Sequence, residues 1–340
     1  MISVIVPVYK NSANIVALLE ALEELNRTLK RSFEVVFVVD GSPDDSALQL
    51  ARALPAAGFR SQLLNLSRNF GAFQAIRAGL KAASGDCLAV MAADLQEPPE
   101  LIVEFDRRLR SGEFDIAVGQ RLGREDPALS RLSSAMFWRL YRRFIQHEVP
   151  PGGVDIFACT GAVRDQLVSL SENNSSLIGL LFWVGFRRTF VPYKRRGRVA
   201  GVSAWTFSKK TRYLVDSVFS FSDLPLQLLT RVGVLGLVVS VGLSGVVLAS
   251  KILGNIAVPG YTATVLLVMF FGALNCFAVG LVGGYVWRTY ENTKGRPGHI
   301  VVSQERFDPG RAGRSDGDNA NEQEHGGKGG EILPAPAGSG

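Results

Sequence analysis

Cysteine is scarce in this chain. Its 340 residues include three cysteines, Cys87, Cys159 and Cys276, which are widely spaced and flanked by apolar residues. Three cysteines cannot all pair with one another, and their spacing fits no metal-binding pattern. The sequence therefore excludes a disulfide scaffold and a cysteine-based metal centre, and it predicts reduced thiols in a reducing compartment.

A leader segment is also lacking at the N-terminus. Met1 continues directly into the apolar run Ile2–Val8, with no basic segment before it. A secretory signal peptide carries such a basic segment ahead of its apolar part. We therefore expect no cleavable signal peptide.

Charged residues are absent from two long stretches, Val232–Ser250 and Tyr261–Trp287. These stretches raise the mean hydropathy of the chain to +0.16, which is high for a soluble enzyme. Each reaches the roughly 20 residues that cross a bilayer as an α-helix, and neither has a polar face. The sequence predicts two transmembrane helices.

The connection Lys251–Gly260 is too short to be a domain, so the two spans form a hairpin with both flanks on one side of the membrane. The flanks are basic, with Arg231 before the hairpin and Arg288, Lys294 and Arg296 after it. An excess of Lys and Arg marks the cytoplasmic side, which predicts a multi-pass protein of the cell (inner) membrane. The spans carry no charge that could line a transport path, so we expect any flippase to be a separate partner.

Short apolar runs alternate with amphipathic helical segments over about the first 120 residues. The segment 14–29 places its leucines on one helical face. Continuous apolar strands alternating with helices predict an α/β fold with a parallel sheet covered on both faces. The predicted strands are Ile2–Val8, Phe33–Val39, Gln62–Leu66, Cys87–Met91 and Asp115–Val118.

Three more elements are predicted before the basic part of the chain: a helix at Ala128–Phe144, a strand at Val154–Cys159 and a helix at Ala162–Leu170. The stretch Lys194–Arg212 then holds seven basic residues and no acidic one. Such a stretch next to a membrane segment meets anionic lipid head groups, so we favour the membrane and expect no nucleic acid as partner.

Polar residues follow the ends of the predicted strands, namely Asp40, Arg68 with Asn69, and Asp94. A parallel sheet binds its ligands beyond the carboxyl ends of its strands, so we expect these side chains at one site. Asp94-Leu95-Gln96 offers a carboxylate and an amide oxygen, which suit a divalent cation bound across a diphosphate. A solvated turn is the alternative interpretation of a lone Asp-x-Gln.

Two other loops are candidates for nucleotide contacts. In Asp40-Gly41-Ser42, the carboxylate can accept hydrogen bonds from a base or ribose, and the glycine lets a ligand approach the backbone. In Arg68-Asn69-Phe70-Gly71, the guanidinium and the backbone amides of a helix start can face a phosphate. An ordinary turn and an ordinary capped helix are the respective alternatives.

Two further candidates lie later in the chain. Asp155 stands in the segment Gly152-Gly153-Val154-Asp155, where a carboxylate can act as a base or orient a second reactant. Arg198 and Ser203, with Trp205, lie in the basic stretch and suit a phosphate at the membrane interface. The alternative for Asp155 is an ordinary turn or helix-capping aspartate. The alternative for Arg198 and Ser203 is a solvated basic segment.

The order of these motifs resembles the family 2 glycosyltransferases that act on polyprenyl phosphates, the group of polyprenyl-phosphate glucosyltransferases and dolichol-phosphate mannose synthases. The resemblance covers about residues 1–302. Its most specific part runs from Leu66-Ser67-Arg68-Asn69-Phe70-Gly71 through Ala83-Ser84-Gly85-Asp86 to Ala93-Asp94-Leu95-Gln96-Glu97-Pro98-Pro99-Glu100. Further matches are Ser3-Val4-Ile5-Val6-Pro7-Val8-Tyr9, Asp40-Gly41-Ser42, Trp183-Val184-Gly185-Phe186, Ser220-Phe221-Ser222 and Gly280-Leu281-Val282-Gly283.

The resemblance implies a GT-A fold, a Rossmann-like and mostly parallel sheet, followed by a two-helix transmembrane hairpin. It implies inverting transfer of a sugar, first of all glucose from a UDP donor, to undecaprenyl phosphate, with Mg²⁺ or Mn²⁺ as cofactor. The product would serve cell-envelope glycan modification, and the protein would be a homo-oligomer. A catalytically inactive scaffold and a processive polysaccharide synthase are the alternatives, but the Gln-x-x-Arg-Trp signature of the latter is absent.

The resemblance also assigns residues. Pro7, Tyr9, Asp40 and Ser42 would line the nucleoside pocket, with Arg68 and Asn69 on the donor as well. Asp94 and Gln96 would hold the metal and the diphosphate, Asp155 would be the acceptor-side carboxylate, and Arg198 and Ser203 would meet the acceptor phosphate. The family's Gly-Asp-Phe-Arg segment is present here as Val154-Asp155-Ile156-Phe157, without its arginine.

The predicted organisation has five parts. They are a catalytic domain over residues 1–206, juxtamembrane amphipathic helices over 207–230, the membrane hairpin over 231–289 with spans at about 232–251 and 261–287, a cytoplasmic segment over 290–307, and a disordered tail over 308–340.

Overall fold

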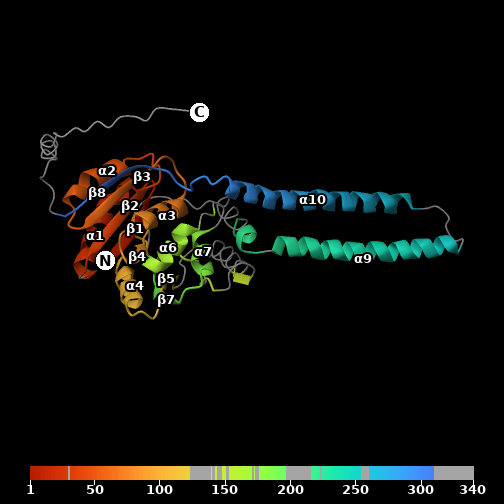
Figure 1. The fold of residues 1–340 in the computed structure, drawn as a ribbon, viewed down its shortest axis with the longest axis horizontal. Coiled ribbons are helices and arrows are strands. Elements are labelled where there is room, and N and C mark those ends of the chain that lie inside the picture. Colours follow the sequence, from red (N-terminus) through yellow and green to blue (C-terminus); the bar gives the residue numbers. More distant parts are fainter. Residues whose placement is uncertain are drawn as a thin grey trace, which may run out of the picture.

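The computed structural model describes residues 1–29, 31–122, 139, 142–143, 148–150, 153–170, 172, 176–196, 216–222, 224–253 and 260–309 (Figure 1). The predicted helix at Ala128–Phe144 falls almost entirely outside these residues, as do Arg198 and Ser203.

A sheet of eight strands in the order β7-β5-β6-β4-β1-β2-β3-β8 forms the centre of the domain. β1 pairs in parallel with β2 and β4, β2 with β3, and β5 with β7. β6 and β8 run antiparallel to their neighbours. The strands are β1 (Ile2–Val8), β2 (Phe33–Val39), β3 (Arg60–Leu66), β4 (Cys87–Val90), β5 (Ile116–Arg121), β6 (Phe157–Thr160), β7 (Arg188–Tyr193) and β8 (Val301–Phe307).

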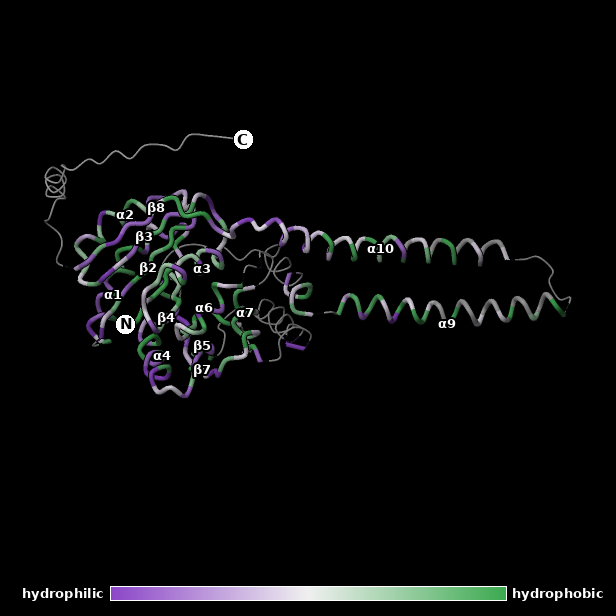
Figure 2. Tube along the Cα trace, viewed as in Figure 1, coloured by the Kyte–Doolittle hydropathy of each residue, from purple (hydrophilic) through white to green (hydrophobic). Residues whose placement is uncertain are grey.

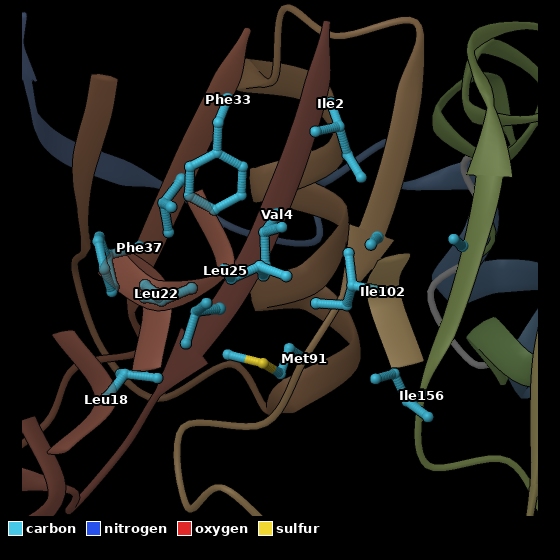
Figure 3. Close-up of a cluster of buried hydrophobic side chains, with 14 of the residues drawn as sticks. Ile2, Val4, Leu18, Leu22, Leu25, Phe33, Phe37, Met91, Ile102 and Ile156 are labelled. Carbon is cyan, nitrogen blue, oxygen red and sulfur yellow. The ribbon is translucent and has the colours of Figure 1, made fainter. Parts of the chain in front are cut away.

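Helices cover both faces of this sheet, as the continuous apolar strands predict. One face packs against α1 (Ile15–Leu29), α2 (Ser46–Ala53) and α4 (Glu100–Arg110), in the cluster of Figure 3 that joins Val4, Leu22 and Ile102. The other face packs against α3 (Ala72–Ala82), α6 (Gly161–Ser169) and α7 (Leu177–Trp183). Two 3-10 turns, η1 (Ser12–Asn14) and η2 (Leu54–Ala56), flank α1 and α2. The mostly parallel, GT-A-like sheet is therefore confirmed.

β7 and β8 were not predicted from the sequence. The side chains of β8 are mostly exposed on both faces, and its sequence VVSQERF shows no regular alternation of apolar and polar residues. β8 nevertheless pairs with β3 and brings the chain back to the sheet after the long helices. The predicted strand Val154–Cys159 is observed as Phe157–Thr160, because pairing with β4 begins at Phe157.

Two long helices, α9 (Leu224–Ile252) and α10 (Tyr261–Thr293), extend away from the sheet domain (Figure 1). They contact each other where a Cβ built on Gly236 would lie 3.2 Å from the ring of Phe271. Apolar residues recur along both helices (Figure 2). Among the described residues, Phe270–Thr293 is long and apolar enough to cross a membrane, with a mean hydropathy of 1.5, and the apolar part Leu224–Gly236 of α9 is shorter.

A buried carboxylate ties together the strands that support the site. Glu34 is 1% exposed and accepts hydrogen bonds from Ser3 Oγ at 2.5 Å, Gln62 Nε2 at 2.8 Å and the Ser84 amide at 2.9 Å. Burial raises the pKa of Glu34, but the hydrogen bonds from Ser3, Ser84 and Gln62 outweigh burial and lower the pKa overall.

The Glu34 network predicts a pH-dependent stability. Because the pKa of Glu34 is lower in the folded chain, the network stabilises the fold above the ordinary carboxyl pKa of 4.5, and this stabilisation is lost as the pH falls through the folded value. Glu34→Gln is expected to lower the free energy of unfolding at pH 7 by about 2–3 kcal/mol, the scale of a charged hydrogen bond, and to flatten its decline in acid. Urea unfolding of the detergent-solubilised protein between pH 7 and pH 3 measures both effects. An unchanged acid profile would contradict this assignment.

Candidate active site

The carboxyl ends of β1, β2, β3 and β4 lie along one edge of the sheet, since these strands are parallel neighbours. The predicted donor-side residues lie at these four strand ends. They are Pro7 near the end of β1 and Tyr9 just after it, Asp40 and Ser42 after β2, Arg68 and Asn69 after β3, and Asp94 and Gln96 after β4. The structure thus places them along one edge, where ligands of parallel sheets bind.

Asp40 fastens the loop after β2 to the loop after β3. Its carboxylate is 2% exposed and accepts hydrogen bonds from the amides of Phe70 at 2.7 Å and Gly71 at 2.9 Å. Burial raises the pKa of Asp40, and these two hydrogen bonds and the charge of Arg68 oppose that effect. Asp40 therefore shapes the donor-side loops through contacts that the sequence did not predict.

Gly41 allows the same two loops to touch. Its φ is +56°, in the left-handed region that favours glycine. A Cβ at this position would lie 2.3 Å from the backbone carbon of Arg68 and 2.5 Å from the amide nitrogen of Asn69. The Arg68 guanidinium in turn lies 4.1 Å from the centroid of the Phe70 ring. The structure thus brings the backbone of the loop after β3 against Gly41, whereas the sequence predicts the close approach of a ligand at this glycine.

Ser42 and Asp44 organise the turn between β2 and α2. The Ser42 hydroxyl accepts a hydrogen bond from the Lys10 amide at 2.8 Å and donates one to Asp44 at 2.6 Å. Asp44 also accepts the Ser12 amide at 3.0 Å. Burial raises the pKa of Asp44, but the hydrogen bonds of Ser42, Ser46 and Ser12 outweigh it and hold the pKa well below its usual range. These hydrogen bonds connect the turn to residues 10–12, directly after Tyr9.

Two strained residues stand at this edge. Among the described residues, Lys10 (φ +55°) and Leu95 (φ +53°) are the non-glycine residues with left-handed backbone. They follow the neighbouring strands β1 and β4. Such conformations cost about 1 kcal/mol each and persist where the surrounding structure fixes them, which is common at functional sites. In the Asp94 loop, the Gln96 amide donates to Asp94 Oδ1 at 3.4 Å, and Leu95 packs on the core.

Asp155 is held by residues from two other strands. Arg121, at the end of β5, forms an ion pair with it, and the Tyr193 hydroxyl at the end of β7 donates a hydrogen bond to its Oδ2 at 3.0 Å. Burial lowers the pKa of Arg121, but the Asp155 carboxylate outweighs burial and raises it. Burial, Asp155 and Glu97 all raise the pKa of Tyr193, so its hydroxyl stays a neutral donor. The arginine that pairs with Asp155 in this chain thus comes from β5.

Glu97 is a site residue that the sequence analysis missed. Its side chain is 1% exposed, and burial raises its pKa to about 7, helped by the charges of Asp155 and Asp94 and opposed by Arg195 and Arg121. The charges of Asp94 and Asp155 thus both act on the buried Glu97 carboxyl, which lies 3.5 Å from the Arg195 guanidinium that contacts the Asp94 loop. The position of Glu97 directly after Asp94-Leu95-Gln96 was a signal that could have identified it. The local sequence does not show, however, that this glutamate is buried.

The start of the basic stretch packs on the Asp94 loop. Arg195 Nη2 donates to Gln96 Oε1 at 2.6 Å, and the Arg196 amide donates to the Gln96 carbonyl at 2.9 Å. The Arg196 side chain pairs with Glu100 at 3.2 Å. The predicted phosphate ligands Arg198 and Ser203 lie just beyond this segment, outside the described residues.

The Asp94 loop suits Mg²⁺ or Mn²⁺ that arrives with its phosphate ligands. Asp94 and Gln96 offer one carboxylate and one amide oxygen, both hard donors. Within the part of the chain that the structure describes, no three acidic, His or Cys side chains converge as a cage. A cation here would need further oxygen ligands from outside the protein, and Mg²⁺ in nucleotide sites takes these from phosphates and water.

Comparison with known proteins adds sequence relatives. Residues 3–169 match the family described as glycosyl transferase family 2. An uncharacterized glycosyltransferase of Synechocystis sp. is 32% identical over 301 residues, 88% of this chain and 94% of that protein. A prophage bactoprenol glucosyl transferase homolog of Escherichia coli is 30% identical over 302 residues, 88% of this chain and 98% of that protein.

Among solved structures, glucosyl-3-phosphoglycerate synthase from Mycobacterium tuberculosis is similar to part of this chain. That structure holds Mn²⁺, UDP and glucosyl-3-phosphoglycerate. It aligns with a TM-score of 0.45 and 18% identity, over 64% of this chain and 78% of that chain.

Proposed function

The chain belongs to glycosyl transferase family 2, and from this premise we propose that it transfers a sugar from a nucleotide-sugar donor to polyprenyl phosphate. The observation that supports the chemistry is the position of the Asp94 loop at the carboxyl end of β4, in line with the ends of β1 to β3, with Arg195 bonded to Gln96 at 2.6 Å and 3.5 Å from buried Glu97. The charges of Asp94 and Asp155 both act on Glu97, which supports a place for Asp155 in the same region. The observation that carries the acceptor is the likeness, over 88% of the chain, to a relative named as a bactoprenol glucosyl transferase homolog. The product is a polyprenyl-phosphate-linked monosaccharide, and UDP-glucose is the first donor to test.

The donor lies across the carboxyl ends of β1 to β4. Pro7 and Tyr9 form one side of the nucleoside pocket, and Asp40 and Ser42 form the other. The 2.8 Å bond between Lys10 and Ser42 fixes these two walls relative to each other. Arg68 and Asn69 face the phosphates, where the Arg68 guanidinium stabilises negative charge. Asp40 holds their loop in place through its bonds to the Phe70 and Gly71 amides.

Departure of the nucleotide diphosphate is assisted at the Asp94 loop. Asp94 and Gln96 would hold Mg²⁺ or Mn²⁺, and the bound cation would supply Lewis-acid stabilisation of the leaving diphosphate. Fixed donors and charges at this place require no rearrangement as negative charge develops. The strained Leu95 keeps the two ligands in one rigid turn.

Asp155 acts on the acceptor side. A phosphate monoester is already ionised near neutral pH, so a strong general base is not required. Asp155 is paired with Arg121 and bonded to Tyr193, which fits a group that orients the acceptor. The phosphate oxygen then attacks the anomeric carbon from the face opposite the diphosphate, which inverts the configuration. Arg198 and Ser203 bind the same phosphate.

The membrane brings the acceptor to this site. We place α9 and α10 in the bilayer as a hairpin, with Arg231 and Arg288 on the cytoplasmic side together with the sheet domain. The stretch Phe270–Thr293 meets the length and hydropathy that one span needs. The protein is then a multi-pass protein of the inner membrane that works as a homo-oligomer, and a flippase partner moves its product.

The proposed reaction predicts a lipid-soluble product. Purified protein in detergent should transfer radiolabelled sugar from one of a panel of nucleotide sugars to undecaprenyl phosphate, and only with Mg²⁺ or Mn²⁺ present. The labelled sugar is measured after extraction into organic solvent, with EDTA-treated protein as control. Absence of an extractable product with every donor, from protein that unfolds cooperatively, would overturn the proposal.

A further inference from the structure

Arg195 lies between two acceptors in the Asp94 loop. Its Nη2 donates to Gln96 Oε1 at 2.6 Å, and its Nε lies 3.5 Å from Glu97 Oε1, close enough for an ion pair but long for a hydrogen bond. The backbone beside it is fastened separately, by the bond of the Arg196 amide to the Gln96 carbonyl at 2.9 Å. The Arg195 side chain can therefore change partner while its backbone stays in place.

Glu97 has unused capacity to accept hydrogen bonds. The carboxylate is 1% exposed, and among the described residues neither of its oxygens accepts a hydrogen bond. Buried carboxylates are normally paired and hydrogen-bonded, because an unpaired one is costly to remove from water. Here both oxygens stay unsatisfied although the guanidinium of Arg195 is adjacent, because that guanidinium bonds Gln96 instead.

Metal binding by Gln96 conflicts with the observed position of Arg195. The Gln96 amide oxygen that accepts the guanidinium is the oxygen that the proposed function assigns to Mg²⁺ or Mn²⁺. A guanidinium and a divalent cation on one oxygen are like charges in contact, so the arginine has to leave when the metal arrives. Glu97 is the nearest acceptor of opposite charge that the ion-pair geometry provides.

We propose that Arg195 is a positioning residue with two alternative partners, Gln96 when no metal is bound and Glu97 when metal and nucleotide are bound. This inference rests on the proposed function, since it concerns the same metal ligand. Moving to Glu97 frees the Gln96 oxygen, gives the buried carboxylate its hydrogen bonds and neutralises the guanidinium beside the cation. The role of Glu97 is thus to accept hydrogen bonds from Arg195 when the metal is bound.

The test is a double-mutant cycle on metal affinity, read without enzyme activity. Mn²⁺ binding to the full chain in detergent is titrated by EPR in the presence of UDP. Glu97→Gln is expected to weaken Mn²⁺ binding about 10-fold to 100-fold, the usual effect of removing a residue that supports a metal ligand. Arg195→Gln is expected to bind Mn²⁺ at least as tightly as wild type. The double variant is expected to bind like Arg195→Gln, because Glu97 no longer has an arginine to receive.

A matched control uses the neighbouring exposed pair. Glu100→Gln and Arg196→Gln remove the 3.2 Å ion pair on the same segment and should leave Mn²⁺ affinity unchanged. If Glu97→Gln weakens binding equally with and without Arg195, Glu97 acts on the metal directly and the inference is wrong. Equal affinity in all variants would also overturn it, while leaving the proposed function intact. Absence of Mn²⁺ binding in the wild type would overturn it together with the proposed metal site.

Discussion

Asp94→Asn is expected to lower the rate of sugar transfer about 1,000-fold, the scale reached when one preorganised group that stabilises a leaving charge is removed. Asp94 is the carboxylate of the loop after β4, and its neighbour Gln96 supplies an uncharged oxygen. An amide at position 94 keeps the size of the side chain but loses its negative charge. The protein then offers the cation only uncharged oxygens at this loop, so the cation is bound more weakly and the diphosphate departs without full charge compensation.

The measurement is the initial rate of transfer at saturating donor, with the metal concentration varied. Asp165→Asn serves as the control because it makes the same chemical change on α6, in a side chain that is 65% exposed. The control should keep the wild-type rate, and both variants should unfold in urea like the wild type. A wild-type rate in Asp94→Asn would show that Asp94 does not hold the metal.

Gly41→Ala is expected to lower the free energy of unfolding by about 3 kcal/mol, in the upper range for a single substitution, and to weaken donor binding at least about tenfold. Alanine at the left-handed φ of +56° costs about 1–2 kcal/mol by itself. Its Cβ would in addition lie 2.3 Å from the backbone of Arg68, so the two loops have to separate. Separation stretches the hydrogen bonds from the Phe70 and Gly71 amides to Asp40, and it displaces the side of the nucleoside pocket that Asp40 and Ser42 form.

Urea unfolding and calorimetric titration with UDP measure the two effects. Gly112→Ala is the matched control, because Gly112 also has positive φ (+75°) but nothing lies within 4 Å of the position that its Cβ would take. The control should show the conformational cost and no loss of UDP affinity. Equal effects of the two substitutions would mean that loop contact at Gly41 does not matter to the donor site.

The sequence predicts the centre of the fold well because that part is buried on both faces. β1 and β2 are apolar runs, each with one buried polar residue (Ser3 and Glu34), and both are nearly unexposed throughout. Such runs favour a parallel sheet that is covered on both faces. β8 is the opposite case. It lies at the edge of the sheet with most side chains exposed. Its place beside β3 depends on contacts across more than 230 residues of chain, for example the pairing of Gln304 with Leu64 and the hydrogen bond from the Gln304 side chain to Gln62. No local pattern records such a pairing.

The candidate site likewise has parts that the sequence predicts and parts that it does not. Strand ends place Asp40 and Asp94 at one edge, and the sequence predicts that placement from strand order alone. It does not predict that Asp40 binds the amides of Phe70 and Gly71, because that contact depends on how closely Gly41 lets the loops approach. Nor does it predict Arg121 as the partner of Asp155, since β5 and β6 have to pair first.

The central claim is that a sugar, without its phosphate, moves onto the phosphate of a polyprenyl lipid. The most direct test incubates the protein with a nucleotide sugar and undecaprenyl phosphate, then identifies the released nucleotide and the lipid product by mass spectrometry. The account predicts a nucleoside diphosphate and a lipid that carries one phosphate and one sugar. A nucleoside monophosphate with a lipid that carries two phosphates would show transfer of a sugar phosphate, and would contradict it.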